Sequence, residues 1–78
     1  MTAKPHVLVK RSVSLDGHRT SVALEQMFWD EIDALAKRQG LSVSGLISQV
    51  DRGRHTDQNL ASALRLAVLE ALRQPTHD

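Results

Sequence analysis

The sequence predicts one small domain that is mainly α-helical and carries a short β-ribbon. Three observations predict this fold. Side chains alternate between two faces over residues 19–24, which is the two-residue period of a strand. Apolar side chains then recur every three to four residues over about 26–39 and 43–52, and again over about 58–73, which is the period of amphipathic helices. At 78 residues the chain is long enough for one domain, which we place at residues 7–73.

The ribbon is predicted from a turn signal near the start of the chain. Asp16-Gly17 strongly favours a two-residue turn between antiparallel strands, and it lies in the middle of residues 7–24. In the register that this turn sets, apolar side chains face apolar side chains across the pair, so a hairpin over these residues is self-consistent. The alternative is a basic arm, in which Lys4, Lys10 and Arg11 contact phosphates.

The strand over residues 19–24 has backbone groups that must pair and an apolar side that must be covered. The simplest partner is the same strand in a second copy of the chain. A chain of this size also buries too small a share of its surface to be comfortably stable alone, and it has no cysteine that could form a disulfide. We therefore expect two copies to fold together as a homodimer, with higher oligomers open.

The first two helices have clear ends. Lys37 and Arg38 lie in the last turn of the first helix, where cations favour the negative end of the helix dipole, and Gly40 supplies a left-handed stop. Ser42 is expected to cap the start of the second helix. Gly45 lies inside that helix, where close approach to a second helix would explain it. Nine apolar residues are expected to form the core of the dimer: Val22, Leu24, Phe28, Trp29, Ile32, Leu35, Leu46, Ile47 and Val50.

The third helix is expected to begin behind a cap at Thr56 or Asp57 and to end before Pro75. Its apolar face is broad, since Leu66 and Leu69 extend it beyond what one small domain can cover. We expect part of this face at a contact with another subunit or with another protein. Residues 1–6 are predicted to be a mobile arm and residues 74–78 a tail.

The order of strand, helix, glycine turn and helix over residues 19–50 resembles the ribbon-helix-helix family of DNA-binding proteins, the class of the MetJ and Arc repressors. The resemblance implies an intertwined homodimer whose strands pair as an antiparallel ribbon, with alternate side chains in the major groove of DNA. This chain resembles a variant with an extra strand before the ribbon and a third helix after it. The side chains carried over by position to base contacts are Arg19, Ser21 and Ala23.

The resemblance also implies phosphate contacts at the start of the second helix. There the amides of Val43 and Ser44, behind the Ser42 cap, would bind a phosphate, because unpaired amides and the positive end of the helix dipole attract an anion. Ala23 departs from the pattern, because it cannot form a hydrogen bond with a base and could only touch a thymine methyl group. Lys10 and Arg11 are further candidates for phosphate contacts.

An extra strand would make the sheet of the dimer wider than the DNA groove that it is expected to enter. If the segment before the turn flanks the ribbon in both copies, the symmetric sheet becomes four strands wide. The major groove is about 12 Å wide and admits a helix or a two-stranded ribbon, so a wider flat sheet would clash with the DNA backbones. Either the first strand turns away near DNA, or the sheet has a different role.

The net charge of +1 does not by itself indicate a nucleic-acid partner, but its distribution is uneven. Residues 1–24 carry four basic side chains and one acidic one, whereas residues 25–36 carry four acidic side chains and no basic one. The positive part of the chain is therefore the part that contains the predicted ribbon.

No pattern in the sequence predicts an enzyme. The four histidines are scattered without metal-ligand spacing, and no phosphate-binding loop or nucleophile motif is present, so we expect no metal and no cofactor. No apolar run is long enough to cross a bilayer, and the start has no signal-peptide pattern; we expect a cytoplasmic protein without a membrane partner.

Two functions are expected from these patterns. The first is a small homodimeric transcriptional regulator that binds specific double-stranded DNA with its ribbon in the major groove. The alternative is a protein-interaction or oligomerisation module, or an antitoxin-like partner, that uses the C-terminal helix and binds DNA weakly or not at all.

Overall fold

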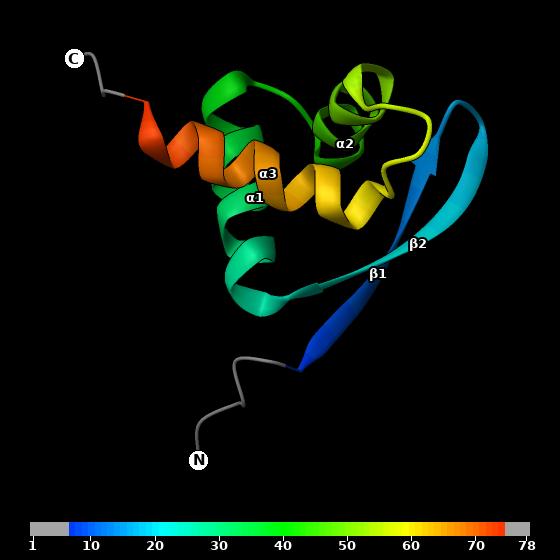
Figure 1. The fold of residues 1–78 in the computed structure, drawn as a ribbon, viewed down its shortest axis with the longest axis horizontal. Helices are drawn as coiled ribbons and strands as arrows, with labels where there is room; N and C mark the ends of the chain where they lie inside the picture. The colour runs from blue at the N-terminus through cyan, green and yellow to red at the C-terminus, as the bar shows by residue number, and fades with distance from the viewer. Residues whose placement is uncertain (1–6, 75–78) are drawn as a thin grey trace.

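The computed structural model of the chain describes residues 7–74. The predicted arm at residues 1–6 and all but the first residue of the predicted tail lie outside the described residues. Within the described part, a two-stranded antiparallel ribbon precedes three helices, which confirms the predicted fold class (Figure 1). None of the helices in this part is long and apolar enough to cross a membrane.

Five elements make up the described fold, and their ends lie within two residues of the predicted ranges. They are β1 (Leu8–Leu15), β2 (His18–Glu25), α1 (Gln26–Gln39), α2 (Val43–Gly53) and α3 (Leu60–Arg73).

The two strands form a hairpin within one chain. Leu15 pairs with His18 next to the turn, and the register continues without a bulge to the pair of Leu8 and Glu25. Asp16 and Gly17 both adopt positive φ angles, 51° and 82°, which is the conformation that matches the twist of a two-residue hairpin. The segment before the turn is therefore a strand rather than an arm. β2 therefore pairs along one edge within its own chain, as the predicted hairpin requires, and a second copy is not needed to pair that edge.

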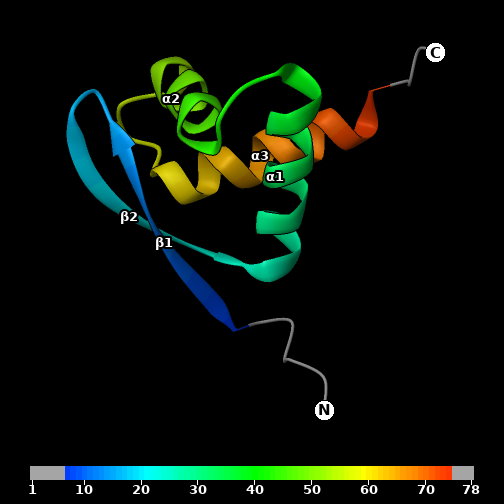
Figure 2. The same cartoon turned by 180° about the vertical axis from the view of Figure 1, so that it is seen from behind.

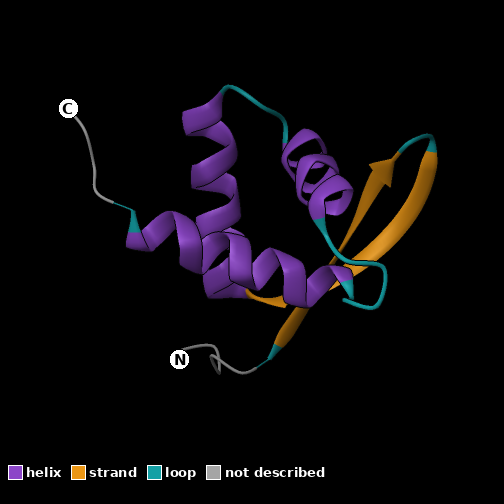
Figure 3. Cartoon of the chain, turned by 45° about the horizontal axis from the view of Figure 1, so that its top comes forward, coloured by secondary structure: helices purple, strands orange, loops and turns teal. Residues whose placement is uncertain are grey.

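The ribbon lies against the helices with one face only. Figures 1 and 2 show a long twisted ribbon along one side of the three helices, and Figure 3 shows α1, α2 and α3 arranged around a common centre. α2 packs against β1, while α1 and α3 pack against β2. The helices therefore cover one face of the hairpin and leave the other face open.

The core is built within one chain. Trp29 is fully buried, and its indole N–H donates a hydrogen bond of 2.8 Å to the backbone oxygen of Val9 on β1. The buried side chains of α3, which are Ala63, Leu64 and Val68, close the core from the side of the third helix. Six of the nine predicted dimer-core residues are buried in the single chain: Val22, Leu24, Trp29, Ile32, Leu46 and Ile47. The remaining three are half-buried: Phe28, Leu35 and Val50.

Helix ends follow the predicted chemistry except at α3. Gly40 ends α1 with φ 69°, and the Ser42 side chain accepts a hydrogen bond of 2.9 Å from the amide of Gly45. The α3 cap is Asn59, whose side chain accepts from the amide of Ser62 at 2.8 Å, so the predicted cap at Thr56 or Asp57 is wrong. The reason is a contact that local sequence does not reveal. Arg54 bonds both the Asp51 carboxylate and the backbone oxygen of Gln58, which holds the loop in a non-helical path up to residue 58.

Candidate nucleic-acid interface

The hairpin has two chemically different faces, because successive side chains of a strand point to opposite sides. We call the face that packs on the helices the inner face and the open one the outer face. The inner face is mostly apolar and holds the buried residues Val13, Val22 and Leu24. Six residues in the middle of the outer face concern us here: Lys10, Ser12, Ser14, Arg19, Ser21 and Ala23. All of them are exposed except Ala23, which is half-buried.

The register places these six residues in three directly opposed pairs. Lys10 lies opposite Ala23, Ser12 opposite Ser21, and Ser14 opposite Arg19. The six residues include two cations, and their three hydroxyl groups can donate or accept hydrogen bonds. None of the six is acidic. The outer face thus contains the three residues predicted to contact bases, the predicted phosphate contact Lys10, and two serines of β1 for which the sequence predicts no role.

Arg11, a predicted phosphate contact, lies on the inner face instead. Its guanidinium donates two hydrogen bonds to the carboxylate of Asp33 on α1, at 2.9 and 3.1 Å, and lies 4.5 Å from the ring centre of Trp29. The hydrogen bond to Asp33 raises the pKa of Arg11 further above its ordinary value. Its charge is therefore compensated inside the chain, and the side chain fastens β1 to α1. Lys10 and Arg11 are adjacent in sequence, yet they lie on opposite faces of the ribbon.

A second arginine fastens the other strand. Arg65 on α3 donates to one carboxylate oxygen of Glu25 from Nε at 3.0 Å and from a terminal nitrogen at 2.8 Å, and it lies 5.6 Å from the ring centre of Phe28. The backbone amide of Glu25 and then the side chain of Arg65 hold the pKa of this carboxyl below its ordinary value. The acidic group at the end of β2 is thus paired with a helix and does not oppose the positive charge of the outer face.

The start of α2 has the predicted cap. Ser42 is exposed, while Val43 and Ser44 are half-buried, and the amides of a first helical turn have no acceptor within their own helix. A Cβ added at Gly45 would lie 3.2 Å from the Ser42 hydroxyl oxygen and 3.7 Å from the Cβ of Leu41. The nearest neighbours of Gly45 are thus residues of the cap and not of another helix.

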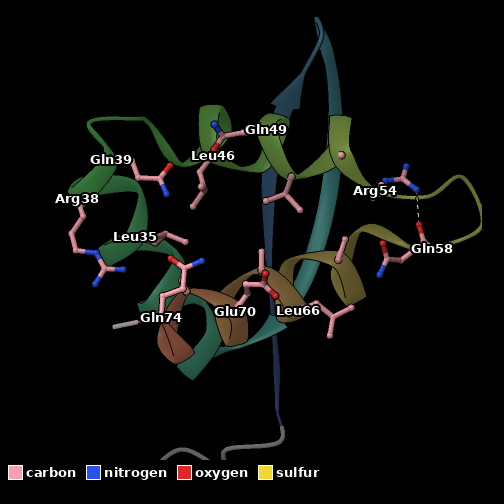
Figure 4. Close-up of a pocket in the computed structure, with 15 residues that line it drawn as sticks. Leu35, Arg38, Gln39, Leu46, Gln49, Arg54, Gln58, Leu66, Glu70 and Gln74 are labelled. Atoms are coloured by element: carbon pink, nitrogen blue, oxygen red, sulfur yellow. Dashed lines mark hydrogen bonds between the residues drawn. The ribbon is translucent and has the colours of Figure 1, made fainter. Parts of the chain in front are cut away.

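A groove of about 620 Å³ opens between the three helices. Its apolar lining includes Leu35, Leu46 and Val50, three of the predicted dimer-core residues, together with Leu66 of α3. Polar side chains, among them Arg38, surround it, as Figure 4 shows. The sequence alone does not reveal this groove, because it forms only where three helices meet, although the broad apolar face of α3 indicates an exposed apolar surface. On α3, Leu66, Leu69 and Leu72 remain 55%, 49% and 59% exposed.

Residues 7–74 hold no group of three histidine, aspartate or glutamate side chains that could bind a metal ion. Two surfaces of this part of the chain are candidates for a functional role: the outer face of the ribbon and the groove between the helices.

Comparisons with known proteins agree with the fold. The family described as the ribbon-helix-helix domain matches residues 8–72. Among solved structures, an uncharacterized protein from Bordetella pertussis Tohama I is similar, with a TM-score of 0.72 and 35% sequence identity over 87% of this chain. The matched region spans 58% of that protein. No curated protein matches the chain.

Proposed function

Because the chain belongs to the ribbon-helix-helix family, as its sequence resemblance predicted, we propose that it is a sequence-specific DNA-binding protein that acts as a small homodimeric transcriptional regulator. Proteins of this family generally bind DNA as transcription regulators or antitoxins. The observation that carries the proposal is the outer face of the ribbon. It is exposed, it holds Lys10 and Arg19 with three serines, and its central six residues include no acid.

The residues predicted to contact DNA have roles that suit their chemistry. Arg19 donates two hydrogen bonds to the major-groove edge of guanine, and Ser21 exchanges a hydrogen bond with a neighbouring base. Ala23 leaves room for the methyl group of thymine. Lys10 binds a phosphate, and the first-turn amides behind Ser42 bind another, because phosphate contacts set the position of the ribbon while base contacts set the sequence.

The homodimer has two candidate contact surfaces in this chain. One is the second edge of β2, which pairing between copies would use. The other is the apolar groove with the exposed leucines of α3, since exposed apolar surface beside a groove is typical of a contact with another protein. Either contact would place two DNA-reading surfaces in one particle. We place the protein in the cytoplasm, where bacterial-type repressors meet DNA.

DNA binding is tested by fluorescence anisotropy with duplexes of random sequence, at salt concentrations from 50 to 200 mM. A complex with two or more phosphate contacts should weaken about tenfold or more over this range, since each contact contributes a slope of about −0.9 to the dependence of log affinity on log salt. Lack of retention at 50 mM, or an affinity that does not change with salt, would contradict the proposal.

A second candidate function is favoured by the groove. The same chain would be a protein-interaction module or an antitoxin-like partner that holds another protein between its helices. Deleting α3 would not test this, because Leu64 and Val68 belong to the core. Substitution of the exposed Leu66 and Leu69 by Gln is the better test. If these changes lower the mass in solution and wild-type protein binds no DNA, the interaction function is favoured.

A further inference from the structure

We propose that β1 is a phosphate-binding strand. In a dimer that pairs β2 with its own copy, Lys10, Ser12 and Ser14 of each chain contact the phosphate backbones that border the major groove, and they do not contact bases. This inference rests on the proposed function and goes beyond it, because it gives the first strand of the chain a role of its own. The central strand β2 sets the preferred sequence, and the outer strand β1 contributes affinity and fixes the position of the ribbon.

The second edge of β2 indicates where the copy pairs. Opposed residues of an antiparallel pair alternate between those whose backbone groups bond to each other and those whose groups point away. The pair next to the two-residue turn, Leu15 with His18, is the first bonded pair. Counting from it, the backbone groups of Arg19, Ser21 and Ala23 point to the second edge, and no other segment among the described residues bonds to them. Pairing about a two-fold axis at the middle residue places Ser21 opposite Ser21 of the second copy.

The width of the resulting sheet places β1 over the walls of the groove. The sheet of the dimer has four strands about 4.8 Å apart, with the two β2 strands at its centre. Each β1 strand then lies about 7 Å from the two-fold axis, whereas the walls of a major groove about 12 Å wide lie about 6 Å from its centre. A flat sheet would meet the phosphates before its centre entered the groove. The hairpin is twisted, as Figures 1 and 2 show, so the central strands can enter the groove while the outer strands follow its two walls.

The outer face of β1 has the chemistry of a phosphate-binding surface. Lysine and serine side chains are among the groups that commonly donate hydrogen bonds to phosphate oxygens. Lys10, Ser12 and Ser14 are exposed, and among the described residues none of them has a side-chain hydrogen bond or an ion pair with another part of the chain. Their donors are therefore available to a ligand. The two serines are also short, which lets the backbone of β1 approach the phosphates closely.

The register gives Ala23 a place in the same arrangement. In one row of opposed side chains across the proposed sheet, Lys10 of one chain is followed by Ala23 and then by Arg19 of the second copy. Ala23 thus separates the outer cation from the central one by two strand spacings, which is about 10 Å. One cation faces the phosphates and the other faces the bases.

The pairing of the strands is tested with single cysteines, because the chain has none of its own. Ser21→Cys places two thiols across the two-fold axis, where opposed Cα atoms lie about 5.5 Å apart, a distance that a disulfide spans. Ser12→Cys is the matched control, since its two thiols lie on the outer strands, about 14 Å apart. Mild oxidation without DNA should therefore give a covalent dimer of Ser21→Cys and not of Ser12→Cys. If Ser21→Cys forms no more covalent dimer than Ser12→Cys does, β1 is not the outer strand and the inference is overturned.

The phosphate contact of Lys10 is tested by the salt dependence of DNA binding. Lys10→Ala and Arg73→Ala each remove one exposed positive charge, but Arg73 is the last residue of α3. The probe is a duplex selected by the wild-type protein from random sequences. Lys10→Ala should lower the steepness of the salt dependence by about 0.9 for each bound chain, so that the loss of affinity between 50 and 200 mM salt becomes about tenfold smaller for the dimer. Arg73→Ala should leave the salt dependence unchanged.

The role of the serines is tested by comparing affinity with sequence preference. Ser12→Ala with Ser14→Ala should weaken binding about tenfold or more to every duplex and leave the selected bases unchanged, because hydroxyl contacts with phosphates carry no sequence information. Arg19→Ala, in contrast, should change the selected bases. The control is Ser48→Ala with Ser62→Ala, which removes two hydroxyl groups from the helices and should leave the affinity unchanged. Circular dichroism shows whether each variant remains folded.

The outcomes separate the two proposals. If wild-type protein binds no DNA, the proposed function fails and the inference fails with it. If wild-type protein binds DNA but Lys10→Ala keeps the wild-type salt dependence, β1 lies away from the phosphates and the inference alone is overturned. A change in the selected bases when Ser12 and Ser14 are replaced would also overturn it, because β1 would then contact bases.

Discussion

The two faces of one hairpin differ in how their charged side chains are used. On the inner side, Arg11 bonds Asp33 and lies on Trp29, and at the end of β2 the carboxylate of Glu25 bonds Arg65. On the outer face, Lys10 and Arg19 are exposed. Charge near the helices thus fastens the ribbon to the core, while charge on the outer face is available for a partner. The net charge of the chain conceals this division, since it counts fastened and available cations alike.

The largest expected effect is on the free energy of unfolding, and it comes from removing the buried Trp29 side chain beneath the inner face. Trp29→Ala should cost about 3–5 kcal/mol of unfolding free energy, because a large buried side chain leaves a cavity. It also leaves the backbone oxygen of Val9 without its donor. Since small domains have unfolding free energies of only about 5–15 kcal/mol, this loss is a large fraction of the total stability. Urea unfolding followed by circular dichroism measures this. Met27→Ala on the exposed side of α1 is the control, and an equal unfolding midpoint for the two variants would be inconsistent with the observed core.

The next effect is on the outer face and concerns sequence preference. Arg19→Ala should lose about 1–3 kcal/mol of discrimination at one base position in each half-site, which is the range for a bidentate contact with guanine. Its stability should stay close to that of the wild type, since the side chain is exposed. Selection of binding sites from random duplexes measures the preference. An unchanged preference at every position would remove Arg19 from the base contacts.

A comparison of Arg11→Ala with Lys10→Ala tests whether the inner-face cation stabilises the fold more than the outer-face cation does. The variant loses an ion pair that is partly exposed and a contact with the Trp29 ring, and together these stabilise the fold by about 1 kcal/mol. Lys10→Ala, one residue away on the other face, should change the unfolding free energy by less than about 0.5 kcal/mol. The comparison uses urea midpoints of both variants under one condition. If Lys10→Ala is the more destabilising of the two, then Arg11 is not the residue that holds the ribbon on the core, and Lys10 is not available to a partner.

The smallest effect is the pH dependence of the Glu25 and Arg65 pair. The pKa of Glu25 is lowered in the fold, so its contribution is present above the ordinary value of 4.5 and is lost as pH falls through the folded-state pKa. Glu25→Gln has no such titration. The difference in thermal midpoint between wild type and Glu25→Gln should therefore be larger at pH 6 than at pH 3. A difference that grows as pH falls would mean that this carboxylate does not favour the fold.

Local patterns predict much of the fold, because local chemistry sets it. The turn at Asp16-Gly17, the stop at Gly40 and the cap at Ser42 each depend on residues close in sequence. The alternation along β2 also predicts that Arg19, Ser21 and Ala23 share one face. The partner of Arg11 could not be predicted in this way, because Asp33 lies 22 residues further along the chain and meets it only after α1 packs on the ribbon.

Two further features depend on tertiary contacts and could not be predicted from local sequence: α3 begins later than its predicted cap, and a groove forms between the helices. Arg54 fixes the loop by bonding two different residues, and no helix signal in that segment reveals it. Within one chain, β1 supplies a strand partner for β2 and α3 supplies a cover for the core. The case for a second copy therefore depends on the groove and on the second edge of β2.

The most direct test of DNA binding by the outer face is a nuclear magnetic resonance titration of nitrogen-15-labelled protein with a selected duplex. Amide shifts should change at Lys10, Ser12, Arg19 and Ser21, and at the start of α2, while the helical surface around Leu35 and Leu66 should change little. Shifts that gather at the groove and leave the ribbon unchanged would contradict the account.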